Sequence, residues 1–244
     1  MSVIVNGQPV LLPKDVKSPN CFYNFGTYSP IPAGKTSGIE VNSEKAIKIT
    51  NDKYELFSAL TRKQLNVAGF ELASTAYETE DYSTFVQKFP GGFKAINSKR
   101  ASTHIKSFKD FVGNYKVLEE MIKEDKHTIL IPFVDNGGNL GVTVITVSHW
   151  LRNTKLISGV DPNLVAHNGV FFTNTNNKIA RSLSRRAYQV TEELDIDVAT
   201  VVFQYQNGKH VVIDVTTEDD GTLTPFLSNL ASNILAARGT YLSH

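Results

Sequence analysis

Cationic side chains are concentrated in one short stretch of the sequence, at Lys99, Arg100, His104, Lys106 and Lys109. Lysine and arginine at this density can bind a phosphate group through charge-assisted hydrogen bonds. The same composition also suits a basic loop that meets only solvent. The sequence leaves both interpretations open.

Two further groups of charged residues could do chemistry. Arg181 and Arg185 lie four residues apart, so they share one side of a predicted helix and could meet an anionic substrate. An exposed helix face is the alternative interpretation. Glu218, Asp219 and Asp220 could supply an oxygen ligand to a metal ion, or they could form an acidic surface turn.

Other kinds of site lack the residues they need. The single cysteine, Cys21, excludes an internal disulfide and a thiolate zinc cluster. His149 and His167 have no second ligand at metal-binding spacing. The sequence contains neither a G-x-G-x-x-G nor a G-x-S-x-G pattern.

The composition is that of a globular protein. The 244 residues are 41% hydrophobic and 20% charged, with a formal net charge of +1. This near-neutral balance gives no general attraction to nucleic acid or to an acidic membrane. No apolar run is long enough to span a membrane, and the first residues do not resemble a signal peptide. We therefore expect a cytoplasmic protein.

Hydrophobic periodicity and turn residues predict the elements that would carry these side chains. Strands are predicted at 3–10 as a hairpin around Asn6-Gly7, at 39–41, 70–73 and 93–96, at 128–134 with an antiparallel partner at 141–147, and at 199–215 as a hairpin around Asn207-Gly208. Helices are predicted over 52–67, 80–88, 111–125, 179–194 and 224–238. Residues 152–177 are predicted to be a polar loop. Three domains are predicted: an N-terminal hairpin and loop segment at 1–50, a small subdomain with the Lys94 strand at 51–130, and a C-terminal subdomain at 131–244.

Longer stretches of the sequence resemble a known protein family. The helix at 179–194 and the following LDIDVATVVFQYQNGKHVVIDVTTEDDGTLTPFLSNLASNIL are similar to the C-terminal half of ATP-grasp ligases. The stretches NFGTYS, EKAIKITNDKYELFSALTRKQLNVAGFEL and KFPGGFKAI resemble the family's earlier segments. The short ATP-grasp proteins of tailed phages are most similar in this respect. The resemblance implies an α+β fold in which antiparallel sheets with flanking helices form a cleft.

The resemblance also implies roles for individual residues, with ATP and Mg²⁺ as cofactors. Lys94 corresponds to the family's nucleotide-binding lysine, and Lys53, which corresponds to a lysine at a helix start, is also assigned to nucleotide binding. The remaining assignments place Lys99 and Arg100 at the nucleotide phosphates, Asp214 and Thr216 at the metal, and Arg181 and Arg185 at the substrate.

The sequence departs from the family where the chemistry needs particular groups. Val202 stands where an inner-strand aspartate would bind the metal, and Thr216 replaces an asparagine. The segment 97–104 contains no glycine, although the family uses glycines there to bring backbone N–H groups to phosphate. Asn139 and Gly141 replace a glutamate and an arginine of the family pattern.

These departures lead to two hypotheses about function. The first is a degenerate ATP-grasp protein that binds a ligand or a protein partner, such as a virion component or a host factor, without catalysis and without a required cofactor. The alternative is an active, divergent ligase that uses Mg·ATP to join a carboxylate to an amine or a similar nucleophile. Loss of several expected groups together favours the first hypothesis.

Overall fold

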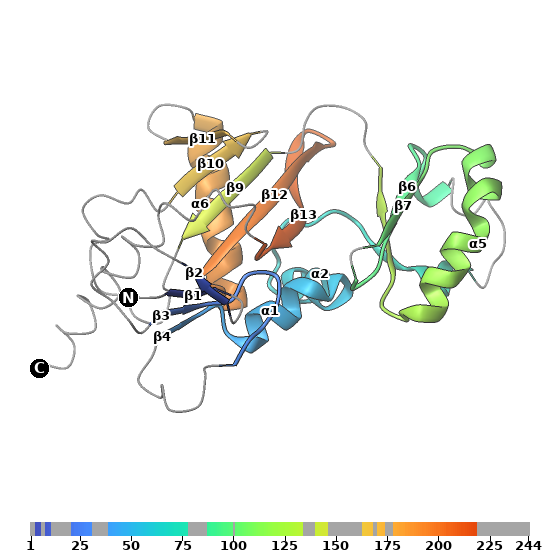
Figure 1. The fold of residues 1–244 in the computed structure, drawn as a ribbon. Coiled ribbons are helices and arrows are strands. Elements are labelled where there is room, and N and C mark those ends of the chain that lie inside the picture. The colour runs from blue at the N-terminus through green and yellow to red at the C-terminus, as the bar shows by residue number, and fades with distance from the viewer. Residues whose placement is uncertain are drawn as a thin grey trace, which may run out of the picture. The chain divides into compact units, whose positions relative to one another are not determined.

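The computed structural model describes residues 3–5, 8–10, 21–30, 39–77, 87–99, 101–133, 140–145, 163–167, 170–173 and 178–218. The chain forms two compact units, which are described separately. The first comprises residues 1–48, 140–202 and 215–244, and the second comprises residues 49–139 and 203–214. The fold is α+β, as predicted, with mostly antiparallel sheets and with helices (Figure 1). No helix in these stretches is long and apolar enough to cross a membrane.

A four-stranded sheet in the first unit contains the predicted N-terminal hairpin. β1 (Val3–Val5) pairs antiparallel with β2 (Gln8–Val10), and the strand order is β2-β1-β3-β4. β3 (Cys21–Tyr23) pairs in parallel with β1 on one side and with β4 (Ile39–Val41) on the other. Pro9 lies in the edge strand β2, as its missing N–H group predicts.

Buried asparagines hold the beginning of the first unit to a segment 155 residues later. Asn42 is 0% exposed and has a left-handed backbone, with a φ angle of 61°. Its Nδ2 donates to the carbonyl oxygens of Asn24 and Val198 at 3.0 and 2.9 Å. Its Oδ1 accepts from the backbone N–H groups of Asp197 and Val198 at 3.1 and 2.9 Å. The Asn42 backbone N–H donates to Asp197 Oδ2 at 2.9 Å.

A five-stranded sheet has the order β11-β10-β9-β12-β13. β9 (Leu140–Ile145) pairs antiparallel with β10 (Asn163–His167), and β10 with β11 (Val170–Thr173). The prediction that 152–177 is only a loop is therefore wrong. The predicted pairing of β9 with β8 (Ile129–Pro132) is also wrong, because β5 and β6 occupy both edges of β8.

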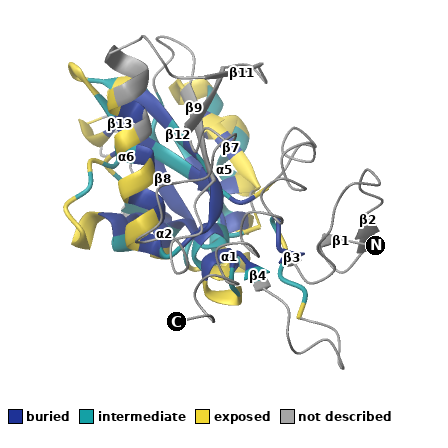
Figure 2. Ribbon diagram, turned by 90° about the vertical axis from the view of Figure 1, so that its left-hand side faces the viewer, coloured by how far each residue is buried: buried dark blue, intermediate teal, exposed yellow. Residues whose placement is uncertain are grey.

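The helix α6 (Lys178–Leu194) confirms the helix predicted over 179–194. It packs beside β9 and β10, and its residues Leu183, Val190 and Leu194 are buried. Tyr188 on the same helix is 37% exposed, and Figure 2 shows that α6 has both buried and exposed residues along its length.

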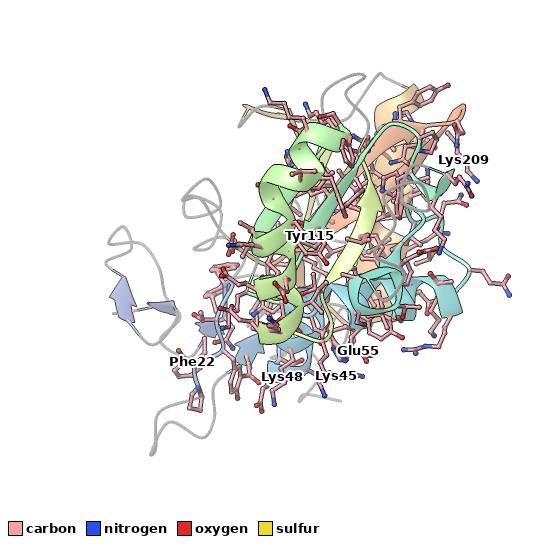
Figure 3. All side chains as sticks on the ribbon, turned by 90° about the vertical axis from the view of Figure 1, so that its right-hand side faces the viewer. Phe22, Lys45, Lys48, Glu55, Tyr115 and Lys209 are labelled. Atoms are coloured by element: carbon pink, nitrogen blue, oxygen red, sulfur yellow. The ribbon has the colours of Figure 1, made fainter. Side chains whose placement is uncertain are left out.

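The hairpin predicted around Asn207-Gly208 is present as β12 (Val198–Gln206) and β13 (Lys209–Thr216). Asn207 and Gly208 have φ angles of 49° and 83°, the positive values that a two-residue hairpin turn requires. Lys209, labelled in Figure 3, is exposed just after the turn. The division between the units passes through this hairpin, and its tip belongs to the second unit.

The helix predicted over 52–67 is shorter and is preceded by another helix. α1 (Glu44–Asn51) and α2 (Lys53–Arg62) are separated by Asp52, whose extended backbone interrupts the helical path. The Asp52 Oδ1 accepts the backbone N–H of Glu55 at 3.0 Å, so Asp52 is the N-cap of α2. α2 ends at Arg62, before the predicted end of the helix at residue 67.

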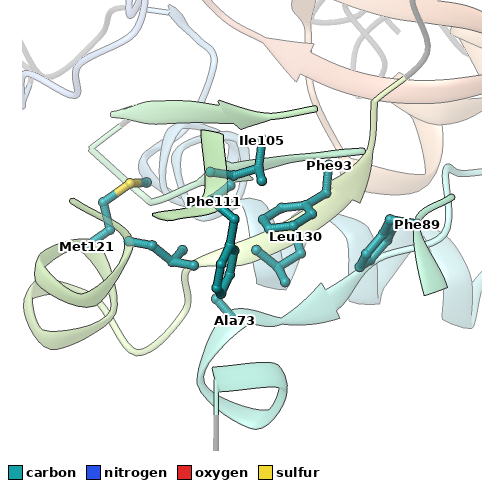
Figure 4. Packing of buried hydrophobic residues seen from close by; sticks show 9 residues of the cluster. Ala73, Phe89, Phe93, Ile105, Phe111, Met121 and Leu130 are labelled. Carbon is teal, nitrogen blue, oxygen red and sulfur yellow. The ribbon is translucent and has the colours of Figure 1, made fainter. Parts of the chain in front are cut away.

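A four-stranded sheet in the second unit has the order β5-β8-β6-β7. Its strands besides β8 are β5 (Glu71–Leu72), β6 (Phe93–Ile96) and β7 (Ser102–Ile105), and the short helix α3 (Ala73–Tyr77) follows β5. α5 (Phe108–Glu124) packs beside β7 and encloses the hydrophobic core of this unit (Figure 4). The buried residues of that core are Ala73, Phe89, Phe93, Ala95, Ile105, Phe111, Leu118, Met121 and Leu130.

Candidate functional site

Lys53 and Asp214, which were predicted for separate roles, form an ion pair within the second unit. Lys53 is the first residue of α2 and its side chain is only 3% exposed, whereas the Asp214 side chain on β13 is 38% exposed. The Lys53 Nζ donates to Asp214 Oδ1 and, at 3.0 Å, to the backbone carbonyl of Thr50. The ammonium group and the carboxylate therefore neutralise each other.

The position of Lys53 makes a nearby negative charge necessary. A helix N-terminus carries a partial positive charge, so a lysine at the first helical position is unfavourable by itself. Burial of the ammonium group adds a desolvation penalty. Asp214 supplies the negative charge from a strand 161 residues further along the chain.

Backbone hydrogen bonds hold β13 beside the segment that follows α2. An isolated parallel bridge joins Val67 to Val212. The Ala68 N–H donates to the Val212 carbonyl, and the Val212 N–H donates to the Asn66 carbonyl, both at 2.9 Å. Asp214 lies two residues beyond this bridge, so the bridge fixes the part of β13 that presents the carboxylate to Lys53.

The residues present do not fit a magnesium site. Mg²⁺ requires hard oxygen ligands with uncompensated negative charge, and the Asp214 carboxylate is already paired with an ammonium group. The Thr216 hydroxyl accepts the backbone N–H of Glu218 at 3.1 Å. Val202 contributes only hydrocarbon. Among the described residues, no three histidine, cysteine, aspartate or glutamate side chains are grouped to hold a metal ion, and Asp219 and Asp220 lie outside those residues.

A histidine is coupled to the cap of α2. The Asp52 Oδ2 lies 2.6 Å from His127 Nδ1, and the rings of Tyr54 and His127 are 5.1 Å apart. The hydrogen bond to Asp52 raises the pKa of His127 above its usual value. Burial opposes the increase, and the negative charges of Asp52, Asp125 and Glu55 add to it.

Lys94 lies on the face of its sheet that is opposite the α5 core. It is half-buried on β6, where its partners in the strand register are His104 and Ile131. The Lys106 Nζ lies 4.2 Å above the centre of the Phe133 ring, and the His104 and Phe133 rings are 5.2 Å apart. We call Lys94, His104, Lys106 and Phe133 the Lys94 surface.

The Lys94 surface combines positive charge with an aromatic ring, which suits an anion that carries an aromatic group. Burial lowers the pKa of His104, and the charges of Lys94 and Lys106 lower it further, so His104 is mainly neutral at neutral pH. Sequence reasoning missed Phe133. The available signal is its position two residues after Ile131, which places both side chains on the same face of an extended segment.

The loop after β6 is shaped by side-chain oxygens. The Asn97 Oδ1 accepts the Ala101 N–H at 2.8 Å, and the Asp125 Oδ2 accepts the Ser98 N–H at 2.6 Å. Lys99 is exposed and its Nζ lies 3.5 Å from a carboxylate oxygen of Glu124. Arg100 lies outside the described residues.

The environment of Asp125 keeps its carboxylate charged. Burial raises its pKa, but hydrogen bonds from Ser98 and from the backbone N–H of His127 outweigh the burial, so the pKa of Asp125 is below its usual value. The His127 N–H donates to Asp125 Oδ1 at 2.9 Å.

The predicted substrate arginines lie on α6 in the first unit. Arg185 is exposed, and the side chain of Arg181 lies outside the described residues. The neighbouring Arg186 is half-buried, and burial lowers its pKa from the usual arginine value. Of the predicted site residues, the structure thus brings Lys53 and Asp214 into contact and places Lys94 beside His104.

Solved structures of known proteins share the fold of this chain, although its sequence matches no model of a protein family and no curated protein. The structure is similar to D-alanine–D-alanine ligase from Bacillus anthracis, with a TM-score of 0.56, 9% identity and coverage of 84% of this chain and 73% of that one. For D-alanine–D-alanine ligase from Coxiella burnetii the values are 0.59, 12%, 92% and 71%. The chain has an ATP-grasp-like fold.

A second kind of enzyme shows the same ATP-grasp-like fold. The N5-carboxyaminoimidazole ribonucleotide synthetase from Thermotoga maritima matches with a TM-score of 0.54 and 17% identity, over 83% of this chain and 53% of the synthetase. The chain thus spans between about half and three quarters of the length of these enzymes. At these identities the likeness establishes the ATP-grasp-like fold and leaves the activity to be argued from the residues.

Proposed function

We propose that this protein uses its ATP-grasp-like fold to bind a ligand or a protein partner, and that it does not catalyse ATP-dependent ligation. The observation that carries the proposal is the ion pair between Lys53 and Asp214. It joins the carboxylate that the family resemblance assigns to the metal and a lysine that the same resemblance assigns to the nucleotide.

The chemistry of ligation makes this pairing significant. Transfer of a phosphoryl group from ATP to a carboxylate spreads negative charge over several oxygens, and magnesium normally supplies much of the stabilising positive charge. Here Asp214 is neutralised, Thr216 is engaged with Glu218, and Val202 has no oxygen ligand to offer. This combination supports binding without phosphoryl transfer.

The Lys94 surface is the proposed ligand site. Its cations would meet phosphate groups and the Phe133 ring would meet an aromatic base. A nucleotide combines both features, and the N5-carboxyaminoimidazole synthetase from Staphylococcus aureus, which shares the fold, was solved in complex with ADP. ATP is therefore the first ligand to test.

An active, divergent ligase is the second candidate. One observation favours it, because Lys94 still projects from the strand face opposite the core, beside His104. In this alternative, Lys94 would hold the nucleotide phosphates and Lys99 or Arg100 would hold the γ-phosphate. Asp214 would have to exchange Lys53 for a metal ion.

Thermal denaturation with ATP and an assay of phosphate release separate the two candidates. We expect ATP to raise the melting temperature of the wild type, because a ligand that binds only the native state stabilises it. Lys94→Ala should abolish this increase. Lys88→Ala, which removes an exposed lysine paired with Glu71, should leave it unchanged.

Phosphate release should equal that of a blank without protein. Mg-dependent ATP turnover that is lost in both Lys94→Ala and Asp214→Ala would refute the binding function and establish the ligase. A wild type that is not stabilised by ATP would remove the Lys94 surface as a nucleotide site.

A protein partner, such as a virion component or a host factor, is the other part of the proposal. One fold can support many unrelated functions, so a fold shared with enzymes is compatible with a binding role. The test is co-purification of the tagged protein from its natural cells. A partner that is retained at high dilution, and whose binding is weakened by substitutions on one surface, is the expected result. Recovery of the protein alone from those cells would contradict it.

A further inference from the structure

We propose that the Lys53 ammonium group is a built-in cation that replaces a divalent metal ion at Asp214. The inference rests on the proposed binding function and specifies how the negative charge of Asp214 is compensated. It predicts that the second unit neither needs nor accepts magnesium at this position.

The geometry around the Lys53 Nζ is that of a cation held by hard oxygens. The nitrogen donates to the Asp214 carboxylate and, at 3.0 Å, to the Thr50 carbonyl. These oxygens come from the end of α1 and from β13, so two separate segments converge on one charged atom. A lysine ammonium is a compact point charge with three donors and no acceptor, which makes it the side chain closest in character to a metal ion.

Burial makes the replacement difficult to reverse. The Lys53 side chain is 3% exposed, so an incoming metal ion would have to force a buried charge away from its carboxylate. A metal ion that entered without displacing it would meet a like charge at close range. The partial positive charge of the α2 N-terminus opposes a second cation as well.

The Asp52 carboxylate, which caps α2, does not offer magnesium an alternative. The Asp52 carboxylate accepts the Glu55 N–H with one oxygen and contacts His127 with the other. Both of its oxygens are therefore engaged with donors. Asp214 and Lys53 thus form a neutral pair with no anionic ligand left over on Asp52.

The wild-type protein provides the first test and needs no substitution. Titration with Mn²⁺, followed by the electron paramagnetic resonance signal of the free ion, should show no uptake beyond that of a buffer blank. The melting temperature should be the same in EDTA and in millimolar Mg²⁺ at matched ionic strength. Uptake of Mn²⁺ that is lost in Asp214→Asn would overturn the proposal.

The second test replaces the built-in cation with an external one. Lys53→Ala removes the ammonium group and leaves space beside the Asp214 and Thr50 oxygens, so it should lower the melting temperature. Propylammonium or Mg²⁺ should restore part of the loss, while tetramethylammonium, which cannot donate a hydrogen bond, should not. Lys45→Ala is the control, because Lys45 is exposed on α1 (Figure 3). Neither propylammonium nor Mg²⁺ should raise the melting temperature of this variant.

Equal melting temperatures of Lys53→Ala in all three salts would overturn the role of Lys53 as a cation, since the loss would then reflect only the packing of its carbon chain. If Lys53→Ala does not fold, the Mn²⁺ titration of the wild type decides the question alone. An active ligase would refute the proposed function through phosphate release, whereas a non-catalytic protein that takes up Mn²⁺ would refute only this inference.

Discussion

Lys53 and Asp214 differ strongly in burial, and this difference determines how much stability is lost when either residue is replaced. A buried ion pair adds little net stability, but removal of one partner leaves the other charge uncompensated. The ammonium is almost fully buried, whereas the carboxylate is partly in contact with solvent. Loss of Asp214 should therefore lower the melting temperature more than loss of Lys53.

The contact between His127 and Asp52 predicts a pH-dependent contribution to stability. The folded-state pKa of His127 is raised, so its contribution is complete below the unfolded-state value of about 6.5 and is lost as the pH rises through the folded-state value. We expect the difference in unfolding free energy between wild type and His127→Gln to be larger in mildly acidic than in alkaline buffer.

Urea denaturation at a series of pH values measures this difference. The effect should be small, because the His127 side chain is 43% exposed and solvent screens the interaction. His104→Gln is a useful control, since the pKa of His104 is lowered and its contribution should change in the opposite direction. A difference that grows with rising pH for His127→Gln would contradict the assignment.

At the scale of elements, Gly92 sets the backbone conformation just before β6, the strand that carries Lys94. Gly92 has a φ angle of 90°, and a Cβ atom there would lie 2.5 Å from the Ile105 carbonyl oxygen and 2.9 Å from the Lys106 Cα. Gly92→Ala should destabilise the protein by about 1–3 kcal/mol, because both the backbone conformation and the contact with β7 are unfavourable for a side chain. Chemical denaturation measures the loss.

Gly113→Ala is the matched control for Gly92→Ala. Gly113 lies within α5 and a Cβ atom there meets nothing within 4 Å, so alanine should stabilise the protein by about 0.4–1 kcal/mol. Equal effects of the two substitutions would show that the close backbone contact at Gly92 is absent in solution.

The elements that the sequence predicted well are those with strong local signals. Asn207-Gly208 predicted its hairpin because few other dipeptides accept two successive positive φ angles. Periodicity predicted α6 in the same way. The β10–β11 hairpin was missed because its strands are short and follow a polar stretch. The partner of β9 was misassigned because hydrophobic alternation identifies a strand without identifying its neighbour.

At the scale of the whole molecule, the Asn42 network ties parts of the first unit that are distant in sequence. Asn42→Ala should destabilise the protein by at least about 3 kcal/mol, because it leaves several buried backbone groups of Asn24, Asp197 and Val198 without their partner. Thermal or chemical denaturation measures this loss.

Asn42→Gly separates the two roles of Asn42. Glycine accepts the left-handed φ of 61° without strain but makes no side-chain hydrogen bond. If the hydrogen bonds dominate, Asn42→Gly should be almost as unstable as Asn42→Ala. Stability close to that of the wild type would show that the backbone conformation, and not the network, is the reason for asparagine.

Contacts between distant residues mark the limit of what the sequence predicted. It indicated the ATP-grasp-like fold through the order of its segments, and the structural comparisons support that fold. It also singled out Lys53 and Asp214, yet nothing in either local segment indicates that the two side chains meet. The Asn42 network was missed for the same reason, because a buried asparagine has no periodic signal.

The loop after β6 has a consequence for how any anion would be recognised. The amide hydrogens of Ser98 and Ala101 already point at Asp125 and Asn97. A phosphate that reaches this loop could not be enclosed by those amides and would depend on long, hydrated side chains such as Lys99. Binding through such side chains imposes little geometric selectivity, and salt screens the attraction. The loop would therefore discriminate among ligands by their charge more than by their shape.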